Sequence, residues 1–333
     1  MAALSLDQLL QMLRAAGEPS RLRLLAVCGQ GEWTVSELTQ ILGQSQPRIS
    51  RHLKLLADAG LLERFREGAW VFYRLATDGG GHEVAKQILA LVPDVAPELD
   101  ADRRRIRQIK ADRQIKARKF FDEQAPEWDR LRQLTVADSM VEAAIISLFA
   151  DDPPPNLLDV GTGTGRILQI LSGLIGFGLG VDLSRDMLSV ARANLEHDRT
   201  GNCQVRQGDM YQLDLPDESF AAVTLHQVLH FAEDPAAVIA EAARVLTSQG
   251  RLVVVDLAPH TVEQLRADHH HRRLGFSDQE IAAWFGAAGL TPGPAKRLEG
   301  KVMATVIWQA RRTRNTANLA EGNPTAANRS AVA

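Results

Sequence analysis

Hydrophobic residues in the first 60 positions recur at the spacing of α-helices. Leu6, Leu9, Leu10 and Leu13 lie one, three or four residues apart, which predicts a helix over residues 6–16. Breaks that contain glycine separate three further predicted helices, over residues 21–28, 35–42 and 45–58. Two short runs with aromatic and β-branched residues, 62–65 and 70–75, flank a Glu-Gly pair and predict a β-hairpin. The first 75 residues are therefore expected to form a small helical domain that ends in a hairpin.

From residue 157 onward, short apolar strands alternate with helices. The predicted strands are 157–160, 177–181, 203–206, 219–225 and 251–256, and the predicted helices are 165–173, 185–196 and 234–246. Such alternation predicts parallel βα units and therefore an α/β domain with a mostly parallel sheet.

Glycine, proline and charge mark the divisions of the chain. A Gly-rich stretch, 78–81, is followed by a predicted helix over 82–92 and by a basic helical stretch over 101–119. We therefore predict a first domain over 1–78, a helical connection over 79–119, an α/β domain over 120–311 and a tail over 312–333. The tail is rich in Ala, Asn and Thr without an apolar pattern, which predicts disorder.

The net charge of −3 conceals an uneven distribution. Residues 1–119 carry 19 Lys and Arg against 14 Asp and Glu, whereas residues 120–310 carry 15 against 26. A basic front and an acidic rear indicate two modules with different partners.

Cysteine content and the first residues limit the class of protein. Only Cys28 and Cys203 are present, which excludes a disulfide framework, and no CxxC pair offers a structural zinc site. The first residues lack the basic and apolar regions of a signal peptide, and no run of about 18 apolar residues occurs. We therefore expect a cytoplasmic protein.

The predicted helix over 45–58 has two different faces. Leu53 and Leu56 fall within about 40° of Ile49 around the helix, whereas Arg51 and Lys54 lie nearly opposite. A helix with this pattern fits the major groove of double-stranded DNA, although a charged face can also be a solvated surface. The DNA-binding candidates are Gln46, Arg48, Ser50, Arg51 and Lys54 on the helix and Arg64 and Arg66 on the hairpin.

The stretches PSRLRLL from Pro19 and SQPRISRHLKLLADAGLLERFREGAWVFYRL from Ser45 resemble the ArsR-type winged-helix repressors. The resemblance covers about residues 5–76 and implies a winged helix-turn-helix domain. It also implies a homodimer, paired through the first helix, that reads an inverted-repeat operator. Metal-sensing members carry a Cys pair in the first helix of the turn motif, and the segment Glu32–Leu38 has none. We therefore expect no metal.

A glycine-rich loop follows the predicted strand over 157–160. Its glycines are Gly161, Gly163 and Gly165, and Asp159 precedes them at the end of the strand. Such glycines let a ligand approach backbone N–H groups at the start of a helix. A carboxylate at this position suits an ammonium group better than a pyrophosphate.

Two more acidic residues stand at the ends of the next predicted strands. Asp182 suits a pair of ribose hydroxyls, and Asp209 suits an adenine amino group, with Met210 beside the ring. Each carboxylate alone is also typical of a helix cap or a turn. Three in successive βα units, behind a glycine loop, favour a nucleoside site.

These residues, with the segments Leu215–Phe220, His226–His230 and Glu241–Gly250, resemble class I methyltransferases. The resemblance is to the subgroup that includes ubiquinone and menaquinone C-methyltransferases, and it implies a Rossmann-like fold and S-adenosylmethionine or S-adenosylhomocysteine as ligand. Phe120–Trp128 resembles the lid segment of that subgroup. The implied ligand contacts are Asp159, Gly161, Gly163, Gly165, Asp182, Leu183, Asp209, Met210 and Gln227.

Catalytic residues are not identified by the sequence. His226 and His230 are weak candidates for a base, with Asp256 and His260 nearby in the pattern, and all of them are also consistent with ordinary loop positions. The run His269–His271 does not predict a metal site, because consecutive helical residues point about 100° apart. Arsenite methylation requires several thiolates, and Cys203 is the only thiol in the α/β domain.

Two hypotheses follow from the combined architecture, which resembles regulators of the methionine cycle that respond to S-adenosylhomocysteine. In the first, the protein is a DNA-binding repressor whose rear domain senses the nucleoside. In the second, it is a small-molecule methyltransferase with an attached DNA-binding domain. For the first hypothesis, we expect the basic stretch 101–119 to transmit the signal from the lid to the DNA-binding domain.

Overall fold

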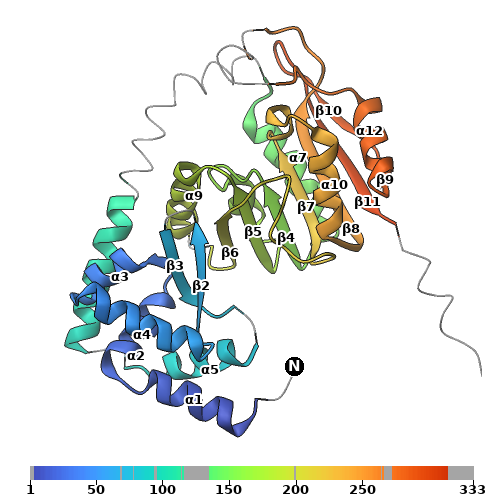
Figure 1. The fold of residues 1–333 in the computed structure, drawn as a ribbon. Helices are drawn as coiled ribbons and strands as arrows, with labels where there is room; N and C mark the ends of the chain where they lie inside the picture. Colours follow the sequence, from blue (N-terminus) through green and yellow to red (C-terminus); the bar gives the residue numbers. More distant parts are fainter. Residues whose placement is uncertain are drawn as a thin grey trace, which may run out of the picture. The chain divides into compact units, whose positions relative to one another are not determined.

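The computed structural model divides the chain into two compact units. The first unit comprises Met1–Ala125 together with Ser184–Gly201, and the second comprises Pro126–Leu183 with Asn202–Ala333. Figure 1 shows the elements of each unit. The residues that the structure describes are 4–67, 70–77, 79–93, 96–113, 115, 135–198, 200–263, 265 and 272–313.

The helices of the first unit agree with the pattern of apolar residues. They are α1 (Leu6–Ala16), α2 (Pro19–Cys28), α3 (Val35–Leu42), α4 (Gln46–Asp58) and α5 (Gly79–Ala90). Ser20, of a type that often caps helices, precedes the predicted range 21–28 but does not cap α2. Glu18 caps this helix, its carboxylate accepting a hydrogen bond from the Arg21 N–H at 2.9 Å. Pro19 is the first helical residue, where its missing N–H costs nothing, so Ser20 lies inside the helix.

A three-stranded antiparallel sheet completes the winged-helix arrangement. Strands β2 (Leu62–Glu67) and β3 (Trp70–Leu75) form the predicted hairpin, and β1 (Trp33–Thr34) pairs with β3 in the order β1-β3-β2. The sequence did not indicate β1, because two residues are too few to show an alternating pattern.

The core of this unit contains the apolar face of α4. Ile49, Leu53 and Leu56 are fully buried together with Trp33 and Leu38. This confirms the predicted division of α4 into two faces. Burial of each such side chain contributes about 1.5–3 kcal/mol, so the core fixes how α4 presents its opposite face.

A helix over residues 97–113 packs on α2 and α3 through its charged residues. Arg23 binds the carboxylate of Asp102 with two hydrogen bonds of 2.7 Å. Arg105 donates to the Ile41 carbonyl at 2.8 Å, and Lys110 donates to the Gln30 carbonyl at 3.0 Å. Part of the basic stretch 101–119 is therefore bound to its own unit. Residues 114 and 116–119, and the predicted boundary after 119, lie outside the described residues.

The first unit also contains a helix from the second half of the chain. This helix is α9 (Arg185–His197), and the chain enters and leaves it from strands of the second unit. The sequence predicted a helix here but not its place in the first unit.

The second unit is built on an eight-stranded sheet. Its strands are β4 (Asn156–Val160), β5 (Phe177–Asp182), β6 (Cys203–Gln207), β7 (Phe220–His226), β8 (Leu246–Leu257), β9 (Leu290–Pro292), β10 (Lys296–Leu298) and β11 (Thr305–Arg312). The order is β10-β11-β8-β7-β4-β5-β6, with β9 also paired to β11. The five strands from β4 to β8 are parallel, which confirms the predicted Rossmann-like sheet.

The helices of this unit are α7 (Asp138–Ala150), α8 (Arg166–Leu171), α10 (Pro235–Val245) and α12 (Asp278–Ala287), with a short 3₁₀ turn η1 (Leu229–Phe231). The antiparallel strands β9, β10 and β11 were not predicted. Strand β11 reaches Arg312, the first residue of the expected tail, and residues 314–333 lie outside the described residues.

Within the described ranges, the helices are too short or too polar to cross a membrane.

Candidate functional site

The glycine-rich loop connects β4 to α8 at the carboxyl edge of the sheet. Gly161, Gly163 and Gly165 have φ angles of 70°, 52° and 78°, a region that residues with a side chain disfavour. The N–H of Gly161 donates to the Val181 carbonyl at 2.7 Å. A Cβ atom on Gly161 would lie 2.3 Å from Cγ2 of Val228. The glycine at 161 is therefore required by the close approach of Val228, a contact that no sequence signal indicated.

The middle of the loop lies open beside the end of β5. A Cβ atom on Gly163 would meet nothing within 4 Å, and the Gly163 N–H donates to Oδ2 of Asp182 at 2.8 Å. Asp182 is the last residue of β5, and the next residue, Leu183, is 68% exposed. The Asp182 carboxylate suits a ligand with hydroxyl groups, and the exposed Leu183 side chain suits an apolar ring. The open Gly163 backbone leaves room for such a ligand.

Asp159, an implied ligand contact, is buried in the structure. Its side chain is only 1% exposed, and Oδ1 accepts a hydrogen bond from the Thr224 hydroxyl at 2.7 Å. Its other carboxylate oxygen has no hydrogen-bond partner among the described residues. Burial raises the pKa of Asp159 to about 6. The carboxyl group is therefore enclosed in the structure and is not open to direct contact with a ligand ammonium in this conformation.

Asp209 follows β6 on the same edge of the sheet. Its Oδ1 accepts a hydrogen bond from the Tyr211 N–H at 2.9 Å, which is the turn interaction that a lone Asp commonly makes. The side chain is nevertheless exposed, whereas that of Met210 is partly buried against the core. The register of β4, β5 and β6 brings Asp159, Asp182 and Gln207 to neighbouring strand ends.

Gln227 lies directly after β7. Its φ of 49° is unusual for a residue with a side chain, and its N–H donates to the Val255 carbonyl at 2.7 Å. This turn sends the chain from β7 towards Val228, the residue that packs against Gly161. The predicted contact Gln227 therefore lies beside the glycine loop.

Histidines and Asp256 lie at the carboxyl ends of β7 and β8. His230 Nδ1 lies 2.8 Å from Oδ1 of Asp256, and both side chains are buried. Burial alone would raise the pKa of Asp256, but the charge and hydrogen bonds of His230 hold it below its ordinary value. Burial lowers the pKa of both His226 and His260. These histidines are therefore mainly neutral at pH 7.

The candidate DNA-binding side chains all lie on the surface of the first unit. Gln46, Arg48, Ser50, Arg51, Lys54, Arg64 and Arg66 are exposed. Arg48 lies 3.8 Å from Glu18, and Lys54 lies 3.1 Å from Asp58, so their charges are partly compensated. Arg51 has no ion-pair partner among the described residues. This guanidinium projects from the face of α4 opposite the core.

Comparisons with known proteins identify both parts of the chain. Residues 16–64 match the family model of a helix-turn-helix domain, and residues 158–254 match that of a methyltransferase domain. The arsenic resistance transcriptional regulator ArsR1 of Pseudomonas putida is 45% identical over 65 residues, 19% of this chain and 51% of the relative. The chain combines an ArsR-type helix-turn-helix domain with a class I methyltransferase domain.

The methyltransferase domain has relatives of its own. The uncharacterized methyltransferase YcgJ of Bacillus subtilis is 32% identical over 100 residues, 30% of this chain and 40% of the relative. The arsenite methyltransferase of Aquipseudomonas alcaligenes is 31% identical over 155 residues, 38% of this chain and 45% of the relative. The chain thus spans about half the length, or less, of these relatives.

The thiols of the two domains are poorly suited to holding arsenic. Cys28, in the ArsR-type domain, is buried, and burial raises the pKa of its thiol far above the ordinary value. Cys203, in the methyltransferase domain, is also buried, with its pKa raised to about 11. Thiolates bind soft metals and metalloids, and neither thiol ionises near pH 7. The sequence contains no third cysteine.

Proposed function

We propose that the protein is a transcriptional repressor whose methyltransferase domain binds S-adenosylmethionine or S-adenosylhomocysteine as an effector. The proposal is carried by two features of one chain. Helix α4 exposes Arg51, which has no ion-pair partner among the described residues, and the second unit has the glycine loop. A helix-turn-helix relative is named as a transcriptional regulator, and another as the arsenical resistance operon repressor of Escherichia coli.

DNA binding is assigned to the exposed face of α4 and to the β2–β3 wing. Arg51, Gln46 and Ser50 are exposed on this helix, and we assign them to base edges in the major groove. Arg64 and Arg66 project from β2, and we assign them to phosphate contacts.

A homodimer that pairs through α1 is part of the proposal. Leu6, Leu10 and Leu13 are exposed on this helix although they recur at helical spacing. A second copy of α1 would bury this apolar stripe, and the resulting two-fold axis matches an inverted-repeat operator.

The nucleoside is assigned to the edge of the sheet formed by β4, β5 and β6. Asp182 would accept hydrogen bonds from the ribose hydroxyls, and Asp209 from the adenine amino group. Leu183 and Met210 would pack on the ring, and the open Gly163 backbone would contact the rest of the ligand. Val228 packs against Gly161 of the glycine loop, and we assign its neighbour Gln227 to the ligand as well.

A second candidate function is methyl transfer to a small molecule. It is favoured by the His230–Asp256 pair and by the neutral His226 at the ends of β7 and β8, which suit a general base. The names of the relatives YcgJ and arsenite methyltransferase also favour it. Alignment of the reactants supplies much of the rate of such reactions, so even a binding domain of this fold is close to an enzyme.

The test begins with selection of the operator from a random duplex library by the full-length protein. Calorimetry then measures the binding of each nucleoside, and fluorescence anisotropy measures operator affinity at one salt concentration with and without it. We expect both nucleosides to bind and S-adenosylhomocysteine to change operator affinity by about 5–150-fold.

Two results decide between the effector role and the enzyme, and the first of them contradicts the effector role. One is nucleoside binding that leaves operator affinity within twofold of its value without ligand. The other is transfer of the methyl group of labelled S-adenosylmethionine to a small-molecule extract at a rate above that of the heat-denatured protein. The second result, together with the first, would favour the enzyme.

A further inference from the structure

Helix α9 follows the proposed nucleoside site along the chain and packs in the unit that carries the DNA-binding candidates. It begins at Arg185, three residues after Asp182, and its N-cap Ser184 accepts a hydrogen bond from the Met187 N–H at 3.3 Å. Its 13 residues span about 20 Å. The helix is therefore a rigid element that starts at the proposed nucleoside site and, by its packing, belongs to the unit that carries α4 and the wing.

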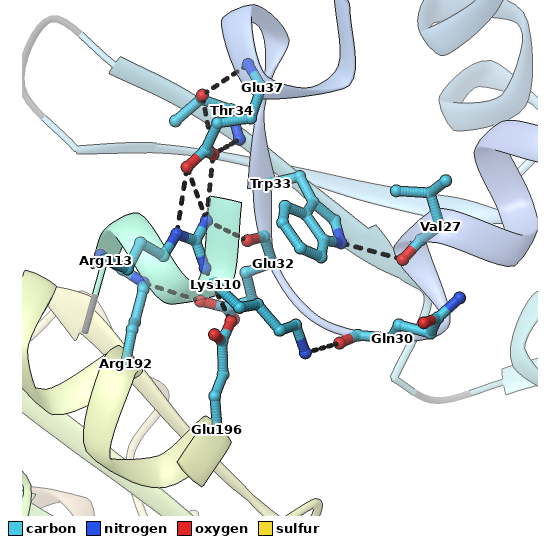
Figure 2. A network of polar contacts seen from close by, with 10 residues as sticks. All are labelled: Val27, Gln30, Glu32, Trp33, Thr34, Glu37, Lys110, Arg113, Arg192 and Glu196. Atoms are coloured by element: carbon cyan, nitrogen blue, oxygen red, sulfur yellow. Dashed lines mark hydrogen bonds and ion pairs between the residues drawn. The ribbon is translucent and has the colours of Figure 1, made fainter. Parts of the chain in front are cut away.

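Two side chains of α9 contact that unit through ion pairs (Figure 2). Arg192 Nε lies 3.2 Å from Oε2 of Glu32, and Glu196 Oε1 lies 2.7 Å from Nη1 of Arg113. Arg192 and Glu196 are four residues apart and so lie on the same face of the helix. Both side chains are less than one-fifth exposed. This face of α9 is therefore fixed by charges that water screens only weakly.

The Arg192 end of the network leads to the wing. Glu32 also accepts a hydrogen bond from Arg74 of β3 at 3.0 Å, and Arg74 binds Glu63 of β2 at 2.7 Å. The guanidinium carbon of Arg192 lies 4.4 Å from the ring centroid of Phe72, also on β3. A displacement of Arg192 thus acts on both strands of the hairpin that carries Arg64 and Arg66.

The Glu196 end leads to the helix-turn-helix. Arg113 bridges Glu196 and Glu37, donating to both carboxylate oxygens of Glu37 at 3.0 Å. Glu37 closes the capping box of α3 with Thr34, whose N–H donates to it at 2.8 Å. Figure 2 shows Arg113 between these two carboxylates. The start of α3, the helix that supports α4 in the turn motif, is therefore held by the same network as α9.

We propose that α9 transmits occupancy of the nucleoside site to the DNA-binding surface through the Arg192–Glu32 and Glu196–Arg113–Glu37 contacts. This inference rests on the proposed effector role, and it narrows the expected route through the basic stretch 101–119 to one residue of that stretch, Arg113, together with α9. A ligand held by Asp182 and Leu183 changes the position or order of the start of α9. The buried ion pairs then move the wing and the start of α3 together, because separating any pair would leave a buried charge without its partner.

The network has features that a merely stabilising surface cluster lacks. Arg74 is 4% exposed in its side chain, and Arg113 is 11% exposed. Burial raises the pKa of Glu196 above its ordinary value and the charge of Arg113 opposes this shift, so the charged carboxylate depends on its ion pair with Arg113. Apolar residues would pack α9 at lower cost, whereas paired charges specify one arrangement of the helix.

The test compares the full-length protein with Glu196→Gln and with Arg192→Lys. Operator affinity is measured by anisotropy with and without saturating S-adenosylhomocysteine, and nucleoside affinity by calorimetry. We expect the ligand-induced change in operator affinity to fall from about 5–150-fold to less than twofold in each variant. Nucleoside affinity should stay within twofold, because neither side chain belongs to the nucleoside site. Arg192→Lys retains the positive charge but changes the geometry of the contact with Glu32. It therefore tests the network even if Glu196→Gln folds poorly.

The matched control is Asp198→Asn, which removes the same charge as Glu196→Gln from an exposed side chain two residues further on. It should behave as the wild type. The proposal would be overturned if both network variants kept the wild-type ligand effect. It would also be overturned if the variants lost operator binding in the absence of ligand, because the network would then have a structural role. A wild type that shows no ligand effect would instead contradict the proposed function itself.

Hydrogen exchange gives a second readout. In the wild type, nucleoside should change the exchange of residues 185–197 and of β3. In Glu196→Gln, the change should remain at residues 160–183. An unchanged pattern in the variant would contradict transmission through α9.

Discussion

The two units hold their candidate sites in different ways. In the first unit, the proposed DNA-binding side chains project from the face of α4 opposite Ile49, Leu53 and Leu56, and the core does not depend on them. In the second unit, the proposed nucleoside site is built from the turns and strand ends of the sheet itself. Gly161 touches Val228, and Asp159 is buried.

In the first unit, DNA affinity can therefore change without a change of folding stability. In the second unit, ligand affinity and folding stability depend on the same residues. Substitutions on the exposed face of α4 should change DNA affinity and leave the fold intact. Substitutions around the glycine loop should change stability together with ligand affinity. The following predictions test this contrast, from the largest expected effect to the smallest.

The most severe loss is expected from the exposed stripe of α1. Leu10 and Leu13 are 38% and 47% exposed, and Leu10→Asp with Leu13→Asp should give a folded monomer by light scattering. Operator affinity should fall by about 10²–10⁴-fold, because the two half-sites would no longer be bound together. Val302→Asp introduces a charge at an exposed apolar position of the second unit and should leave the dimer intact. A dimeric double variant would refute the α1 interface.

Asp159→Asn should stabilise the protein at pH 7 by up to about 3 kcal/mol. The pKa of Asp159 rises from 3.8 to about 6 on folding, and each pKa unit corresponds to about 1.4 kcal/mol. Since the folded state prefers the protonated carboxyl, the wild type loses this stability as the pH rises from about 4 to about 6.

The measurement is the midpoint of urea denaturation of both proteins at pH 4 and pH 7. The two midpoints should converge at the lower pH, where the wild-type carboxyl is protonated. Thr224→Val tests the partner hydroxyl and should destabilise the wild type at pH 7 more than the Asp159→Asn variant. Equal stability of wild type and Asp159→Asn at pH 7 would show that burial does not perturb this carboxyl.

Asp182→Ala should weaken nucleoside binding by about 1.5–3 kcal/mol, or about 10–150-fold, by loss of two charge-assisted hydrogen bonds. It also removes the acceptor of the Gly163 N–H, so a lower melting temperature is expected with the lower affinity. Asp214→Ala removes an exposed carboxylate of the same unit and should match the wild type in both measurements. Calorimetry that finds unchanged affinity would reduce Asp182 to a loop-supporting residue.

Arg51→Ala should weaken operator binding by about 1–3 kcal/mol without any change of melting temperature. The guanidinium is exposed and has no ion-pair partner among the described residues, so its removal leaves no buried group unsatisfied. The double variant Lys296→Ala and Arg297→Ala removes cations from β10 of the second unit and should bind the operator as the wild type does. Unchanged affinity of Arg51→Ala for the operator would remove this residue from the interface.

Local sequence patterns were sufficient for most elements. Four N-terminal helices, the hairpin and the five parallel strands were predicted because apolar spacing, glycine breaks and capping residues act within a few positions of one another. The capping box of Thr34 and Glu37 is an example, since both partners lie in one turn of the chain. The spacing of Gly161, Gly163 and Gly165 likewise indicated a glycine loop between a strand and a helix, and the structure gives all three a positive φ.

Only the tertiary structure decided what the charged residues do. The sequence shows Arg105, Lys110 and Arg113 as part of one basic stretch, yet the fold directs them to Ile41, Gln30 and Glu37. The pattern of α9 predicted a helix, but Arg192 and Glu32 are 160 residues apart, and no local spacing relates them. Long charged side chains have many accessible partners, and packing of distant elements selects among them. For the same physical reason, the sequence did not indicate that Asp159 is buried, since its partner Thr224 is 65 residues away along the chain.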